Sequence, residues 1–138
     1  MKKIITTLLL VFIQMSLYAQ KPEIVGGTAV TNGDYKFMAT LLAPNSGGAT
    51  NLENNFFCGA SLIGPEWVLT AAHCLIDYSS PTPQAISVND VEVGFNIYAL
   101  ENPNGNWVHR TVDMIIIHPD FLDGTDENAD VALIKLSQ

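Results

Sequence analysis

The sequence predicts an all-β domain, and three observations support this fold class. Short runs rich in Val, Ile, Phe and Tyr recur along the chain, clusters of Gly, Pro, Asn and Asp separate them, and no helical period is sustained. The expected strands are residues 36–42, 56–63, 67–71, 91–98, 108–117 and 131–136. Six strands at this spacing fit one barrel or one sandwich, and the pattern leaves that choice open.

The segments between these runs are expected to be turns and loops. Gly64-Pro65-Glu66 joins two runs closely enough for a hairpin. Residues 32–34 and 102–106 mark looser loops, and the Gly- and Asn-rich segment 45–55 is interpreted as an exposed insertion.

The first nineteen residues have the pattern of a signal peptide. Lys2 and Lys3 are basic, residues 4–17 are mostly apolar, and Ala19 is a small residue at which cleavage can occur. The apolar stretch is shorter than the roughly 20 residues that a membrane span needs, and no later segment approaches that length. We therefore expect an exported protein, extracellular or periplasmic, without a membrane anchor.

The charge of the chain excludes one class of partner. Counted from Ile24, the chain has three basic and thirteen acidic residues, and hence a formal charge of −10. Such a surface repels phosphate groups, so neither nucleic acid nor an anionic membrane is an expected partner.

The chain contains two cysteines, Cys58 and Cys74. In an oxidising compartment a disulfide between them can form and persist, and two unpaired thiols are the alternative.

Several local strings resemble the trypsin-like serine proteases, the S1-type enzymes of the chymotrypsin fold. They cover most of the chain after residue 23, in the order found in that family. The strings are Ile24-Val25-Gly26-Gly27, Phe57-Cys58-Gly59-Ala60-Ser61-Leu62-Ile63, Trp67-Val68-Leu69, Thr70-Ala71-Ala72-His73-Cys74, Ile115-Ile116-Ile117-His118-Pro119 and Asp130-Val131-Ala132-Leu133-Ile134-Lys135-Leu136.

The resemblance implies a domain organisation. Residues 1–19 are a signal peptide, residues 20–23 a short propeptide, and residues 24–138 a truncated peptidase domain, equivalent to the first of the two barrels of the family. That barrel is six-stranded and antiparallel. The second barrel, expected to pack against it, lies outside this sequence.

The resemblance assigns His73 as the general base. Acyl transfer to a serine needs a group that takes the hydroxyl proton and returns it to the leaving amine near neutral pH, and histidine does both. A bond from Cys74 to Cys58 is expected to fix the chain beside His73. His109, interpreted as part of a polar loop, and His118, which precedes a proline, are expected to be structural or exposed.

Asp130 is the candidate that orients His73. In this family an aspartate accepts the Nδ1 hydrogen of the histidine and stabilises the imidazolium. The acidic side chains before it, Asp120, Asp123, Asp126 and Glu127, are interpreted as solvated charge, because their spacing does not match a calcium loop. The three histidines lack zinc-ligand spacing, so no metal and no cofactor are expected.

Ile24 is the candidate activation N-terminus. In the family, cleavage before this isoleucine frees an amine that pairs with an aspartate beside the catalytic serine. Glu23 stands where relatives activated by tryptic cleavage have Arg or Lys. The alternative interpretation of residues 24–27 is the plain start of a strand.

The nucleophile of the family is absent from these 138 residues. The motif Gly-Asp-Ser-Gly-Gly does not occur, and Ser46-Gly47-Gly48, which resembles part of it, is interpreted as a turn. We expect a serine endopeptidase by family, acting on protein or peptide substrates, whose chain is inactive alone. The alternative is a secreted, non-catalytic β-domain that binds a protein partner.

Overall fold

The computed structural model describes residues 26–103, 106–122, 124 and 126–138. Residues 26–30 belong to a separate short unit, and the body of the fold is residues 31–138. Ile24, the expected signal peptide and the expected propeptide lie outside the described residues. Within the described residues, no helix has the length and apolar character needed to cross a membrane.

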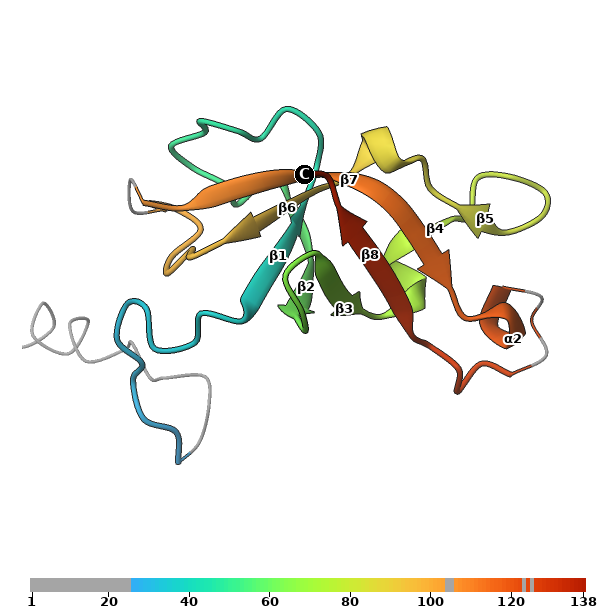
Figure 1. The fold of residues 1–138 in the computed structure, drawn as a ribbon, viewed down its shortest axis with the longest axis horizontal. Coiled ribbons are helices and arrows are strands. Elements are labelled where there is room, and N and C mark those ends of the chain that lie inside the picture. Colours follow the sequence, from blue (N-terminus) through green and yellow to red (C-terminus); the bar gives the residue numbers. More distant parts are fainter. Residues whose placement is uncertain (1–25, 104–105, 123, 125) are drawn as a thin grey trace, which may run out of the picture. The chain divides into compact units, whose positions relative to one another are not determined.

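The body is a closed antiparallel barrel of six strands, in the order β1-β2-β3-β8-β7-β6 (Figure 1). Closure occurs where β1 pairs with β6. The strands are β1 (Met38–Leu42), β2 (Phe56–Leu62), β3 (Trp67–Thr70), β6 (Glu92–Phe95), β7 (Val108–Ile117) and β8 (Ala132–Leu136). All six expected strands are therefore confirmed, and of the two architectures left open the chain adopts the barrel.

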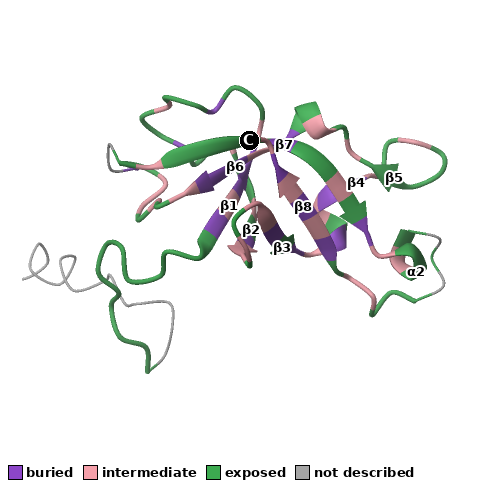
Figure 2. Cartoon of the chain, viewed as in Figure 1, coloured by how far each residue is buried: buried purple, intermediate pink, exposed green. Residues whose placement is uncertain are grey.

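Alternating side chains fill the barrel interior. Along β8, Ala132, Ile134 and Leu136 are buried, whereas Leu133 and Lys135 are only half-buried, as the alternating colours of this strand show (Figure 2). The core that these residues share with other strands includes Leu41, Val68 and Val93, all fully buried. Burial of such side chains stabilises the fold by about 1.5–3 kcal/mol each.

β7 is the longest strand and pairs with two neighbours. Residues 108–111 pair with β6, and residues 112–117 pair with β8. Val112 lies opposite Leu136 and Met114 opposite Lys135, so Asp113 has no partner of its own. This extra residue is a β-bulge.

The sequence did not predict the short elements. Two two-residue strands, β4 (Ile76–Asp77) and β5 (Gln84–Ala85), form a separate sheet. Two 3-10 turns, η1 (Ala72–Leu75) and η2 (Val88–Asp90), and one helical turn, α2 (Pro119–Leu122), complete the described elements. Elements of two to four residues are too short to give a periodic pattern.

Two expectations about loops need correction. Segment 45–55 is not simply an exposed insertion, because Ser46 and Leu52 within it are fully buried. The Ser46 hydroxyl donates to the carbonyl of Ala43, so this serine has a structural role in the turn. His109 does not lie in a polar loop; it is the second residue of β7.

Candidate functional site

His73 and Asp130 meet because of the register between β3 and β8. Thr70, the last residue of β3, pairs with Ala132, the first residue of β8. His73 follows Thr70 by three residues and Asp130 precedes Ala132 by two, so both lie at the same end of the barrel. Two residues 57 positions apart in the chain are thereby brought into contact.

The 3-10 turn η1 holds His73 in place. Its neighbours Ala72 and Leu75 are fully buried in the core. The next residue, Cys74, forms a disulfide with Cys58 of β2, 16 residues earlier. The turn is thus anchored to the barrel on both sides of the histidine, and the expected pairing of the two cysteines is present.

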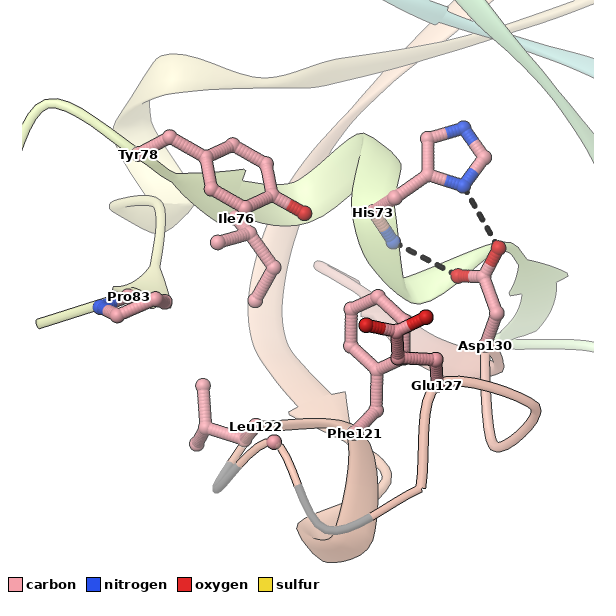
Figure 3. A pocket seen from close by; sticks show the side chains of 9 residues that line it. His73, Ile76, Tyr78, Pro83, Phe121, Leu122, Glu127 and Asp130 are labelled. Carbon is pink, nitrogen blue, oxygen red and sulfur yellow. Dashed lines mark hydrogen bonds and ion pairs between the residues drawn. The ribbon is translucent and has the colours of Figure 1, made fainter.

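The carboxylate of Asp130 contacts His73 twice (Figure 3). Oδ1 accepts the main-chain N–H of His73 at 2.9 Å, and Oδ2 lies 2.7 Å from the imidazole Nδ1. The hydrogen bond from the His73 side chain is the main reason that the pKa of Asp130 is held below its ordinary value of 3.8.

This geometry selects one tautomer of His73. An ionised carboxylate can only accept hydrogen bonds, so the proton of the neutral imidazole lies on Nδ1. Nε2 then has a free lone pair. The His73 side chain is 58% exposed and that of Asp130 34% exposed, so a reacting group can reach Nε2.

The Nε2 atom lies beside the disulfide. The Cys74 sulfur is 3.5 Å away, and Cys58, His73 and Cys74 present ligand atoms within 4.8 Å of one another. Metal binding by cysteine requires a thiolate. Because both sulfurs are bonded to each other, this cluster does not supply a thiolate ligand set.

A cavity of about 620 Å³ adjoins the His73–Asp130 pair. In Figure 3, Tyr78 and Pro83 of the segment after η1 line one side, and Phe121 and Leu122 of α2 line the other. Glu127 lies among these mainly apolar residues. The cavity can accept an apolar group placed next to the His73–Asp130 pair.

A sequence model of the family described as Trypsin matches residues 24–138. The chain belongs to the trypsin family. The resemblance carried by the local strings is therefore confirmed, and the six-stranded barrel is consistent with the first barrel of that family.

Similarity to three curated proteins agrees with the match to the trypsin family. The urokinase-type plasminogen activator of Gallus gallus is 45% identical over 87 residues, which are 60% of this chain and 19% of that protein. The serine protease Hayan of Drosophila melanogaster is 31% identical over 116 residues, 84% of this chain and 16% of that protein. Mouse tryptase is 39% identical over 82 residues, 59% of this chain and 26% of that protein. The chain thus spans less than a third of the length of these relatives.

The other two histidines lie elsewhere. His109 pairs with Glu92 at 3.5 Å on the β6–β7 ladder, and His118 Nδ1 is 4.0 Å from a carboxylate oxygen of Asp120. Each therefore has its own acidic neighbour, and neither carboxylate is Asp130.

The cavity residues were missed by sequence reasoning. Tyr78, Pro83 and Phe121 belong to no family string quoted above, and Glu127 was interpreted only as solvated charge. Their position offered a signal, since all four lie within ten residues after His73 or before Asp130. Residues that closely follow His73 or closely precede Asp130 in the chain are expected to line the site that these two residues form.

Proposed function

We propose that this chain supplies the general base and the orienting carboxylate of a serine endopeptidase. Family membership implies a serine peptidase and peptide substrates. The observation that carries the finer assignment is the 2.7 Å contact between His73 Nδ1 and Asp130 Oδ2, in a His73 side chain that is more than half exposed.

In the proposed reaction, Nε2 of His73 accepts the proton of a serine hydroxyl as that oxygen attacks the substrate carbonyl. The imidazolium so formed is stabilised by Asp130 and then returns the proton to the leaving amine. The serine and the oxyanion hole are expected from sequence outside these 138 residues. The cavity beside His73 accommodates a side chain of the peptide substrate.

The remaining assignments belong to the same proposal. Residues 1–19 act as the signal peptide, residues 20–23 are removed as a propeptide, and Ile24 becomes the activated N-terminus. The Cys58–Cys74 disulfide and the similarity to a plasminogen activator support an extracellular location.

A second barrel is the proposed partner of the β3–β8 face. A nearly apolar groove of about 300 Å³ lies there, lined in part by the exposed side chains of Leu69, Ile116 and Val131. Exposed apolar patches of this kind mark interfaces. The same groove favours the second candidate function, a non-catalytic β-domain that binds a protein partner.

The coding sequence beyond Gln138 discriminates the two functions. An in-frame Gly-Asp-Ser-Gly-Gly supports the peptidase, and a stop codon directly after Gln138 supports the binding domain. The product of the full reading frame should react with a serine-directed fluorophosphonate, and residues 24–138 alone should not.

His73→Ala in the full product should slow this labelling by at least about a thousand-fold, because the base is lost. The matched control is His118→Ala, which should label at the native rate. Native labelling by the His73→Ala protein would remove His73 from its assigned role.

A further inference from the structure

The connection between β1 and β2 is attached to the β6–β7 hairpin at two points. At the first, the N–H of Leu52 donates to the carbonyl of Leu100 at 2.7 Å, and the Leu52 side chain is fully buried. At the second, the turn at residues 45–48 contacts Glu92 of β6 and His109 of β7. The second point contains an ionisable pair that the proposed peptidase chemistry does not use.

Glu92 holds the turn through only one of its carboxylate oxygens. Oε1 accepts the main-chain N–H of Asn45 at 2.9 Å, across 47 residues of sequence. Oε2 is buried and has no hydrogen-bond partner among the described residues, and the Glu92 side chain is only 12% exposed. A buried acceptor without a donor is destabilising.

His109 offers a donor for that oxygen. Its Nδ1 lies 3.5 Å from Oε2 of Glu92. The ring lies directly against the turn, since a Cβ placed on Gly47 would come within 2.6 Å of the imidazole Cε1 and Nε2 atoms. The Trp107 ring lies nearby, with its centroid 6.0 Å from that of the imidazole. The imidazole therefore lies against the turn and near an aromatic ring.

Few other charges face this pair. Arg110, the next residue of β7, donates from Nη1 to the main-chain carbonyl of His109 at 3.1 Å. Residues 45–50 contain no titratable side chain. The adjoining cavity of about 330 Å³ includes residues of the 96–107 connection, and His109 is the one titratable residue among its described lining. Relative to a protonated His109, Glu92 thus provides the opposite charge and Arg110 a like charge.

We propose that Glu92 and His109 form an acid-strengthened latch that holds the β1–β2 connection on the barrel. Histidine changes charge between about pH 5 and 8. When His109 is protonated, both ring nitrogens are donors and Nδ1 can satisfy Oε2 of Glu92 in a charge-assisted contact. The latch is therefore stronger with a charged imidazole than with a neutral one. The inference does not depend on the proposed peptidase activity.

A double-mutant cycle at two pH values tests the latch. Glu92→Gln keeps the shape of the side chain and an acceptor for the Asn45 N–H but removes the charge. In the oxidised chain its melting temperature should fall by about 3 °C more at pH 5.5 than at pH 8.5, an effect below 1 kcal/mol for a domain of this size. This additional fall at pH 5.5 should disappear when Glu92→Gln is compared with its parent in a chain that also carries His109→Gln. An equal fall at both pH values, or an excess that persists with His109→Gln, would overturn the proposal.

A second measurement needs no variant at the latch itself. The amide resonance of Asn45 in the native chain should move between pH 5 and pH 8, because the charge of His109 polarises the carboxylate that accepts this N–H. Glu101→Gln, which removes an exposed carboxylate from the 96–107 connection, is the matched control and should show the same movement. An Asn45 resonance that stays constant across this range would contradict the latch.

Discussion

Two histidine–carboxylate pairs lie on the same barrel and differ in geometry. In the His73–Asp130 pair both carboxylate oxygens bind the same residue, one at its main-chain N–H and one at its imidazole. In the His109–Glu92 pair one oxygen binds a distant turn, and the other lies 3.5 Å from the imidazole without a hydrogen bond. The first pair fixes a tautomer, whereas the second attaches a loop.

The difference shows that a short distance between a histidine and an acid does not by itself define a catalytic site. At His73 the residue lines a cavity and Nδ1 is tied to Asp130. At His109 the ring is pressed against Gly47, and the side chain is 46% exposed. The two pairs therefore differ in how firmly the carboxylate holds the imidazole.

The largest expected difference between the pairs is in activity. In the full-length protease, Asp130→Asn should lower kcat by about four orders of magnitude, because the amide favours the wrong tautomer of His73. Glu92→Gln, the equivalent change in the other pair, should leave kcat within about two-fold. Steady-state hydrolysis of a peptide amide by both variants measures the contrast, and similar losses in the two would abolish the distinction drawn between them.

The second expected effect concerns the covalent anchor that only the first pair has. Replacing both Cys58 and Cys74 with Ala should lower the free energy of unfolding of the chain by about 3 kcal/mol, in the chain-entropy estimate for a loop of this length. Urea denaturation of the variant and of the oxidised parent measures the loss. A loss near zero would mean that the disulfide does not stabilise the end of the barrel that carries His73.

The smallest expected effect concerns the turn against His109. Gly47→Ala places a methyl group 2.6 Å from the imidazole ring, so the ring must move. We expect a loss of at most about 1 kcal/mol, at the low end for overpacking, because the half-exposed imidazole can turn toward solvent. Gly59→Ala in β2 is the matched control, since a Cβ there meets no atom within 4 Å. If denaturation shows equal stability for the two variants, His109 is not held against the turn.

The six strands were accessible from sequence because they carry strong local signals, whereas the choice of a barrel over a sandwich came from the resemblance. Residues 131–136 form a short, mostly apolar run, and Gly64-Pro65 marks the hairpin between β2 and β3. The site was accessible only through the resemblance. No pattern of residues shows by itself that Thr70 pairs with Ala132, and this pairing is what brings His73 to Asp130.

The errors arose where tertiary contacts override composition. Segment 45–55 is polar, yet Leu52 is buried because its main chain pairs with Leu100. His109 and Arg110 interrupt the apolar pattern, yet both lie in β7 because their backbones pair with Gly94 and Val93. Local hydrophobicity cannot report partners that lie far away in sequence.

The bulge at Asp113 explains how β7 serves both of its neighbours. Val112 and Ile115 both contribute to the core although they are three positions apart, which strict alternation forbids. Asp113 supplies the extra residue, so it and Met114 are both exposed, and its carboxylate accepts a bond from Lys135 at 3.3 Å. Deleting either Asp113 or Met114 would leave every inward side chain of β7 inward, whereas a deletion elsewhere in this strand would turn one half of it inside out. The bulge is therefore the one place in this strand at which evolution or an engineer can shorten the barrel wall without exchanging core for surface.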